Sequence, residues 1–343
     1  MRVAELAEPR RFRLVDGPAP ECGPGEVLVQ VKSVGVCGSD LHNFSEGSVG
    51  DIPSVFPMVL GHEPTGVVLR CGAGVTGWQP GDAVICEPAI YCYHCEFCRS
   101  GRHNLCAQIR FLSQPGEPGY FRDIVALPAI NILPMPEGLS FDEATVFEPL
   151  AIILHSLRLA QIQVGETVAV FGAGPIGLLT TAAARIAGAG RIWCVEPVPH
   201  RRDLALQMGA TAVVDPKAVH PGEFLRRDTG GRGVDVVFDC ATKGGSMNHS
   251  LHAARNGGRV VYTGIPSEAT VDLEFHVARR KELAILIVRR SNHETEAALD
   301  LMREDFSRFA PMLTHARPIE KIQPAFEVLE QYADGIGKLV LRF

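Results

Sequence analysis

Short stretches of alternating apolar and polar residues dominate the first 90 residues of the chain. Residues 26–31 alternate in this way, and residues 65–69 and 83–85 are similar short apolar runs that follow turns. Successive side chains of a strand point to opposite faces, so this pattern predicts strands with one buried face. Strand-like sequence returns at residues 120–127. The amino-terminal part is therefore expected to be a compact β-rich domain.

A different pattern begins at residue 167. An uncharged β-type run at 168–171 is followed by a glycine turn and then by a helical stretch rich in Ala and Leu. Further β-type runs, at 191–196, 212–215, 234–239, 259–263 and 284–288, alternate with helical stretches. Such alternation predicts a parallel sheet with helical crossovers, which is a doubly wound α/β fold of the Rossmann type.

The remaining segments complete a two-domain arrangement. Residues 137–160 are predicted to be helical with an interruption at Pro149, and 295–302 and 322–332 are predicted helices before a terminal strand at 338–342. A chain of 343 residues exceeds the size at which single cores usually stop growing. We expect a β-rich domain formed by residues 1–148 and 276–343, and a dinucleotide-binding domain formed by residues 149–275.

Composition narrows the possible partners and location. The formal net charge is −6, and Lys and Arg do not cluster, so no nucleic-acid partner is expected. Charged residues interrupt the first turns, which predicts no signal peptide and a cytoplasmic protein. Residues 167–184 carry no charge, but glycines and a proline in their first half favour a buried strand and helix over a membrane span.

The turn after residue 171 has the sequence G-x-G-x-x-G. Gly172 would permit a tight turn, Gly174 would let the backbone approach a pyrophosphate, and Gly177 would allow the helix to pack on the strand. Between a strand and a helix, this spacing predicts a dinucleotide site with the phosphates on the helix N-terminus. The expected cofactor-binding residues of this loop are Gly172, Gly174, Pro175, Ile176 and Gly177.

An acidic residue, Glu196, follows 19 positions beyond Gly177, at the end of the next apolar run. There it would hydrogen-bond the adenosine ribose and repel a 2′-phosphate, which favours NAD over NADP. The alternative is that Glu196 only caps the next helix.

Four cysteines stand at C-x-x-C-x-x-C-x7-C and are the most specific signal in the chain. This spacing lets one loop place four thiolates around a single ion, and a closed tetrahedral sulfur shell favours a structural zinc. An iron–sulfur cluster or four unligated thiols are the alternatives, and His94 or His103 could replace a thiolate. The predicted ligands are Cys92, Cys95, Cys98 and Cys106.

A second set of metal-binding residue types is spread along the chain. It comprises Cys37 and His42 in C-G-S-D-L-H, His62 and Glu63 in G-H-E, and Glu148 in F-E-P-L. Mixed sulfur, imidazole and carboxylate ligands are typical of a catalytic zinc with one open position. Each residue alone is ordinary, so it is their combination with the other two motifs that predicts the site.

These motifs together resemble the zinc-dependent medium-chain alcohol and polyol dehydrogenases, in the branch that contains sorbitol, xylitol and L-threonine dehydrogenases. The resemblance covers essentially the whole chain, including the closing G-K-L-V at residues 337–340. It implies that the β-rich domain is GroES-like. It also implies two zinc ions per chain, NAD as cofactor, and a homo-oligomer, either a dimer or a tetramer, with the tetramer favoured.

The resemblance also implies roles for single residues. Cys37, His62 and Glu63 would hold the catalytic zinc, and Glu148 would contact its water ligand or exchange onto the metal. Ser39 and His42 would carry the released proton toward the surface. Arg201 would pack near the adenosine, and Arg289 would orient a substrate hydroxyl. Asn43 and Arg290 depart from the aromatic residues common at those positions in sorbitol dehydrogenases.

The predicted reaction is reversible NAD-linked oxidation of a secondary alcohol, in a small polyol or hydroxy compound, to a ketone. Two alternatives remain open. One is an L-threonine-type 3-dehydrogenase that acts on an amino alcohol. The other is a catalytically silent protein that binds NAD and zinc on the same fold.

Overall fold

The computed structural model describes residues 1–343 and divides into two compact units. The first unit comprises residues 1–148, 295–306 and 313–343, and the second comprises residues 149–294 and 307–312. The chain therefore returns to the first unit at Thr295, not at residue 276 as expected from the sequence. The reason is that β18 (Ala284–Ile287) pairs in parallel with β17 (Ala254–Tyr262), which holds the intervening residues in the second unit.

The first unit is built on a seven-stranded sheet with β3 (Glu26–Gly35) near its centre. This strand pairs with β7 (Glu63–Cys71), β11 (Ile124–Pro128) and β20 (Lys338–Arg342). Burial alternates along most of β3, as its sequence predicts, so one of its faces packs into the core. The carboxyl-terminal strand β20 thus lies beside β3, although some 300 residues separate them in sequence.

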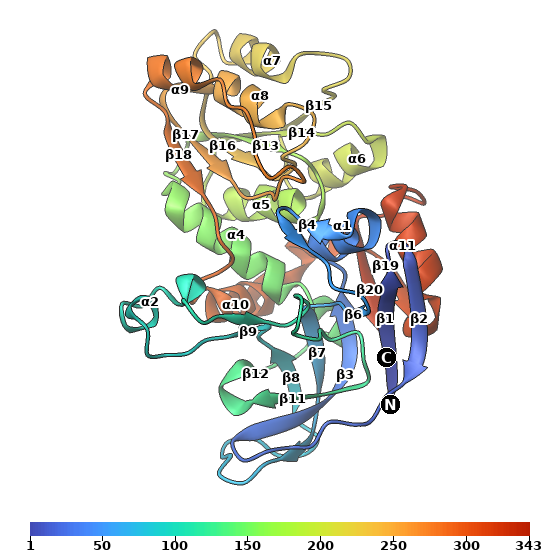
Figure 1. The fold of residues 1–343 in the computed structure, drawn as a ribbon. Helices are drawn as coiled ribbons and strands as arrows, with labels where there is room; N and C mark the ends of the chain where they lie inside the picture. Colours follow the sequence, from blue (N-terminus) through green and yellow to red (C-terminus); the bar gives the residue numbers. More distant parts are fainter. The chain divides into compact units, whose positions relative to one another are not determined.

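The other elements of the first unit surround this sheet (Figure 1). Its remaining strands are β1 (Arg2–Glu8), β2 (Arg11–Asp16), β4 (Ser48–Val49), β5 (Ile52–Pro53), β6 (Met58–Val59), β8 (Ala83–Cys86), β9 (Ala89–Ile90), β10 (Arg110–Phe111), β12 (Ile132–Pro134) and β19 (Leu313–Pro318). Its helices are α1 (Gly38–Glu46), α2 (Glu96–Arg99), α3 (Phe141–Ala144), α10 (Thr295–Asp305) and α11 (Ile322–Glu330).

The helix that leads into the second unit is α4 (Phe147–Ala160). The predicted interruption at Pro149 is wrong, because α4 continues through this residue and the break lies earlier, between α3 and α4. Pro149 is the third residue of α4, where the backbone N–H has no intrahelical acceptor and its loss costs little.

The second unit contains the predicted parallel sheet, in the strand order β15-β14-β13-β16-β17-β18. Figure 1 shows α7, α8 and α9 over one face of this sheet and α5 and α6 over the other. The strands not yet named are β13 (Thr167–Phe171), β14 (Arg191–Val195), β15 (Ala212–Val214) and β16 (Val234–Asp239). The helices are α5 (Pro175–Ile186), α6 (Pro199–Gln207), α7 (Pro221–Asp228), α8 (Ser246–Ala253) and α9 (Phe275–Lys281).

The uncharged run 167–184 forms β13 and most of α5, as predicted. No helix has the length and apolar character needed to cross a membrane.

Candidate active site and metal centres

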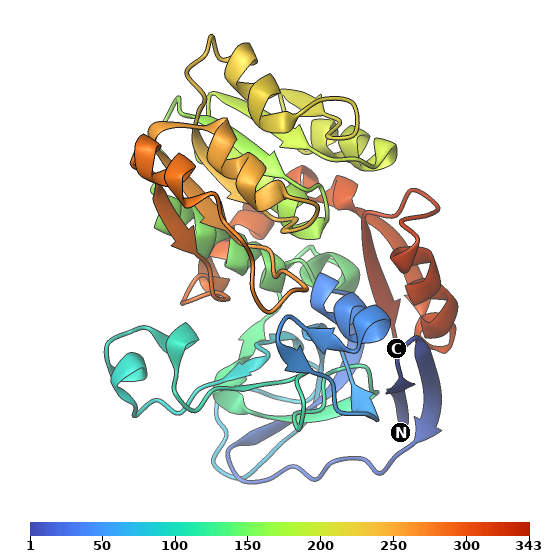
Figure 2. The ribbon, with the colours of Figure 1, turned by 45° about the horizontal axis from the view of Figure 1, so that its top comes forward.

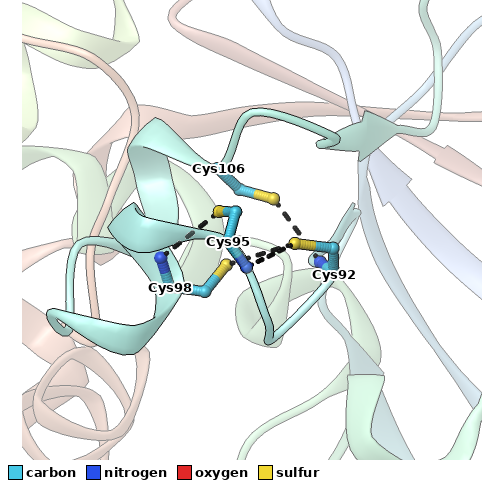
Figure 3. Close-up of side chains that lie close together, drawn as sticks. All are labelled: Cys92, Cys95, Cys98 and Cys106. Atoms are coloured by element: carbon cyan, nitrogen blue, oxygen red, sulfur yellow. Dashed lines mark hydrogen bonds between the residues drawn. The ribbon is translucent and has the colours of Figure 1, made fainter.

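The four cysteines of the spaced motif meet in one loop of the first unit. Their sulfur atoms all lie within 4.8 Å of one another, and the Sγ atoms of Cys92 and Cys98 are 3.9 Å apart. Figure 3 shows the four side chains pointing toward a common centre. None of the four forms a disulfide. A single short stretch of chain, which includes α2, therefore supplies a complete set of four sulfur ligands.

Backbone N–H groups of the same loop point at these sulfurs. The N–H of Cys95 lies 3.4 Å from the Sγ of Cys92, and the N–H of Cys98 lies 3.5 Å from the Sγ of Cys95. A backbone hydrogen bond from Cys98 lowers the pKa of the Cys95 thiol to about 6, whereas burial raises the pKa of the Cys98 thiol. Four thiolates this close require a cation, so the donor set fits a zinc ion.

The two histidines of this loop lie outside the sulfur group. His94 is exposed, and its Nδ1 lies 2.7 Å from the carbonyl oxygen of Cys92. His103 packs against the rings of Tyr91 and Tyr93, each with centroids 5.4 Å away. The group of four potential metal ligands therefore contains sulfur alone.

Three of the dispersed residues also come together in the first unit. Cys37 directly precedes α1, His62 directly precedes β7, and Glu63 is the first residue of β7. Their potential ligand atoms all lie within 4.8 Å of one another, and His62 and Glu63 are buried. Strand β3 ends two residues before Cys37 and pairs with β7, with Gly35 opposite Glu63. This antiparallel register brings the two sequence motifs to the same place.

A buried carboxylate, Asp40, contacts both Cys37 and His62, and the sequence did not identify it as part of the site. Its Oδ1 lies 3.5 Å from His62 Nδ1, and it accepts hydrogen bonds from the N–H groups of Cys37 and Gly61, each 3.1 Å long. Burial opposes charge on His62, but Asp40 and Cys37 together raise the pKa of this imidazole well above its ordinary value. His62 Nδ1 forms no hydrogen bond, so the ion pair with Asp40 is its contact at this nitrogen, and Nε2 would be the ligand atom.

Glu63 carries a second partner that the sequence analysis missed. The ammonium group of Lys338, the first residue of β20, contacts Glu63 Oε2 and donates to the carbonyl oxygen of Val36 over 3.0 Å. Both side chains of this ion pair are fully buried. The site also depends on Gly35, because a Cβ there would lie 2.0 Å from Glu63 Oε2. Lys338 pairs with one oxygen of the Glu63 carboxylate, Oε2. The other oxygen, Oε1, has no hydrogen-bond partner.

Glu148 lies near this group but is not one of the three mutually close residues. It is buried in the first turn of α4, and its Oε2 has no hydrogen-bond partner. Burial raises the pKa of Glu148 to about 8, and the charge of Glu63 adds to this effect while His62 opposes it. The two unpartnered carboxylate oxygens, on Glu63 and Glu148, are donor atoms that a divalent cation would satisfy, so these residues fit a zinc ion.

Ser39 and His42, the predicted proton carriers, both lie on α1, which begins just after Cys37. They are three residues apart and so share one face of the helix. The His42 side chain is 17% exposed, and its Nδ1 lies 3.0 Å from Glu46 Oε2. His42 therefore lies between the interior and solvent, as a terminal proton carrier would.

The glycine loop of the second unit has the geometry expected for each glycine. Gly172 has a φ of 91°, a value that favours glycine, and a Cβ on Gly177 would lie 1.9 Å from the Gly172 carbonyl oxygen. Nothing lies within 4 Å of the position of a Gly174 Cβ, so a ligand can approach the backbone there. Nearby, Thr242 Oγ1 is buried without a hydrogen-bond partner. These features fit a dinucleotide on the N-terminus of α5, which Pro175 and Ile176 begin.

Glu196 follows β14 and holds the glycine loop. Its carboxylate accepts hydrogen bonds from the N–H groups of Ala173, over 2.7 Å, and Val198, over 2.9 Å. These two bonds hold the glycine loop and the residue before α6, and the contact of Glu196 with a ribose stays a prediction. Arg201, on α6, is buried, and its neighbour Arg202 donates to the Glu196 carbonyl oxygen and pairs with Asp215.

Arg289, the predicted substrate residue, belongs to the second unit. It follows β18 and is exposed, whereas the candidate catalytic metal group lies in the first unit. Its role in substrate binding stays a prediction.

A unit with two groups of metal-binding side chains, joined to a parallel sheet with a dinucleotide-type glycine loop, defines a zinc-binding dehydrogenase. The family model of the alcohol dehydrogenase GroES-like domain matches residues 23–137, and that of the zinc-binding dehydrogenases matches residues 175–304. The chain belongs to the zinc-dependent medium-chain dehydrogenase family.

Known relatives match over nearly the full length. A sorbitol dehydrogenase of Bacillus subtilis is 30% identical over 99% of this chain and 97% of its own. A probable D-xylulose reductase A of Aspergillus clavatus is 36% identical over 96% of this chain and 93% of its own. The crystal structure of a putative zinc-binding dehydrogenase from Sinorhizobium meliloti bound to NADP has a TM-score of 0.89, with 30% identity over 100% of this chain and 99% of that one.

Proposed function

We propose that the protein catalyses reversible NAD-linked oxidation of a secondary alcohol of a small polyol to a ketone. The observation that carries this proposal is the group of Cys37, His62 and Glu63. His62 and Glu63 are buried in it, and Glu63 and Glu148 each have a carboxylate oxygen without a hydrogen-bond partner. The similarity to a sorbitol dehydrogenase and a D-xylulose reductase supports a polyol as substrate.

Cys37, His62 and Glu63 would hold the catalytic zinc, with Glu148 beside it, and the four-cysteine loop would hold the structural zinc. A zinc ion in an open site supplies a Lewis acid for the substrate oxygen, which favours loss of the hydroxyl proton and of hydride. Asp40 keeps His62 oriented, and Lys338 keeps the charge of Glu63 compensated. These two residues preorganise the ligands for the metal.

Ser39 and His42 would carry the released proton from the site along one face of α1. An imidazole suits the end of such a path, because its ordinary pKa lies near neutral pH.

The cofactor is proposed to be NAD, bound by the glycine loop with its pyrophosphate on the N-terminus of α5. The carboxylate of Glu196 would repel a 2′-phosphate. Its two backbone hydrogen bonds leave lone pairs that a ribose hydroxyl can still use. Because the Sinorhizobium meliloti structure contains NADP, both cofactors belong in the test.

The decisive assay measures cofactor reduction with zinc-loaded protein and a panel of polyols, threonine and simple secondary alcohols. We expect turnover with a polyol and NAD, and slower turnover with NADP. Activity with threonine alone would instead support an amino-alcohol dehydrogenase. Zinc-loaded protein that binds NADH but oxidises nothing in the panel would support the silent alternative.

We also infer a homo-oligomer, with the tetramer favoured, and a cytoplasmic location. Both inferences rest on the family resemblance and the sequence, and sedimentation velocity of the purified protein would test the first.

A further inference from the structure

The second unit contains a cavity of about 470 Å³ that belongs to neither site described above. Its polar lining comes from Arg226 on α7, from Gly231 and Arg232 before β16, from Arg255 and Asn256 on β17, and from Lys281 on α9. Figures 1 and 2 show α7, α8 and α9 together on one face of the sheet.

The cavity lies at the amino ends of the parallel strands, whereas the glycine loop lies at their carboxyl ends. Its lining residues adjoin the first residues of β16 and β17, which pair in parallel through Val234 and Ala254. The glycine loop instead follows the last residue of β13, which is parallel to both strands. A molecule bound in this cavity would therefore not occupy the dinucleotide position.

Positive charge dominates the cavity, because four of its lining side chains are cationic and none is acidic. The carboxylate of Asp235 pairs with two of these cations, because its Oδ1 accepts hydrogen bonds from Arg232 and from Arg255, each over 2.6 Å. Glu166 also acts on Arg232 at longer range. Arg226 makes no ion pair, and the neighbouring acid on α7, Asp228, is paired with Arg191. The cavity thus retains uncompensated positive charge.

Lys281 is held firmly in this wall. Its ammonium group donates to the carbonyl oxygens of Leu251, His252 and Ala254 over 2.7–2.8 Å, at the end of α8. Burial lowers the pKa of Lys281 to about 8, and the positive charge of Arg226 adds to this effect. Lys281 and Arg226 line the same cavity and no acidic side chain lines it, so an anion bound there would offset both positive charges.

Helix termini explain only part of this arrangement. Arg226 and Lys281 lie in the last turns of α7 and α9, where cations are favoured by the helix dipole. That effect does not account for Arg232 and Arg255, which come from a loop and a strand and line the same cavity.

We propose that this cavity binds a small organic phosphate that carries at least two negative charges. Guanidinium groups match phosphate oxygens in geometry as well as in charge. The volume lies within the range of roughly 300–1,000 Å³ typical of small-molecule sites. The proposal is independent of the polyol reaction, because it involves no residue of the metal groups or of the glycine loop.

The test is calorimetric titration of the zinc-loaded protein with fructose 1,6-bisphosphate in the presence of saturating NAD. NAD fills the dinucleotide site and, unlike NADH, cannot reduce the ketone group of the sugar. Fructose is the neutral control, since it could enter the substrate site but not an anion site. We expect the bisphosphate to bind with one site per chain and fructose not to reproduce this binding signal.

The matched variants are Arg226→Gln and Arg227→Gln, which are adjacent and both exposed on α7. Arg227 does not line the cavity and packs over the Phe224 ring. Loss of one charged hydrogen-bond partner should weaken bisphosphate binding about tenfold in Arg226→Gln. Arg227→Gln should bind like the unmodified protein. Absence of binding to the NAD-saturated protein, or an equal effect of the two variants, would overturn the proposal.

Discussion

The two groups of candidate metal ligands in the first unit are built in opposite ways. Residues 92–106 supply four sulfur ligands from one loop, and the N–H groups around them belong to the same loop. The group of Cys37, His62 and Glu63 is assembled where α1 and β7 begin, and its supports, Asp40 and Lys338, come from α1 and from β20. The first group is local in sequence, whereas the second exists only once the sheet has formed.

The difference matters for what each group can do. A closed shell of four equivalent thiolates leaves no position for a substrate and fits a stabilising ion. The mixed group contains a carboxylate oxygen without a partner, on Glu63, and the buried Lys338 compensates the charge of this carboxylate. Its ligands are supported by side chains from other elements, so a substitution in a supporting residue can shift a ligand without replacing it.

The largest expected effect comes from removing one sulfur ligand from each group in turn. Cys37→Ser should lower turnover by roughly a thousandfold or more, because the Lewis acid loses its ligand, while NADH binding persists. Zinc analysis should show a loss of about one of two ions per chain. If NADH binding disappeared as well, the catalytic metal group and the dinucleotide site could not be independent.

Cys98→Ser is the counterpart in the other group. It should also remove about one zinc ion per chain, but its main effect should be a lower Tm, because a structural ion contributes to folding. Protein that remains folded should retain most of its turnover. A loss of turnover as large as that of Cys37→Ser, at unchanged Tm, would contradict the structural role of this loop.

The next effect concerns the buried ion pair. Lys338→Met removes the partner of a fully buried carboxylate and should destabilise the metal-stripped protein by about 3–5 kcal/mol, measured by urea unfolding. Lys338→Arg keeps the charge and is the matched control, although the bulkier head group should still cost some stability. An equal loss in both variants would point to packing at this position and not to charge.

The smallest effect is a pH dependence caused by Glu148. Its pKa is about 8 in the folded chain, against an ordinary value of 4.5, so the folded state holds this proton more tightly than the unfolded state does. The contribution to stability is therefore present below pH 4.5 and is lost as the pH rises toward 8.

Metal-stripped Glu148→Gln cannot ionise at this position, and its Tm should fall less than that of the unmodified protein across the same pH window, by a few degrees. Thermal unfolding at both ends of the window measures the difference. Identical pH profiles for the two stripped proteins would show that Glu148 titrates with an ordinary pKa.

Sequence reasoning worked where a signal is local and failed where a partner is distant. The glycine loop and the four-cysteine loop were found because their spacing alone implies their geometry. Pro149 was misjudged because its effect depends on its exact place in α4. The return of the chain at Thr295 was misplaced because strand pairing, rather than composition, holds β18 in the second unit.

Two supporting residues could not be recognised in advance for the same reason. Lys338 is 275 positions from Glu63, and nothing in G-K-L-V indicates a buried ion pair. Asp40 did carry a signal, because it stands three positions after Cys37, the N-cap residue of α1. An acidic side chain at that position often accepts a hydrogen bond from the N–H group of the N-cap residue. Its contact with His62 nevertheless needs the pairing of β3 with β7.

The sequence by itself determined the family, the two-domain plan, the dinucleotide loop and the four-sulfur group, because each depends on spacing within a short stretch. Only the tertiary structure decided how Cys37, His62 and Glu63 meet, which charges surround them, and that Arg226, Arg232, Arg255 and Lys281 line one cavity. Contacts between distant segments follow from strand register and helix packing, and local spacing does not specify them.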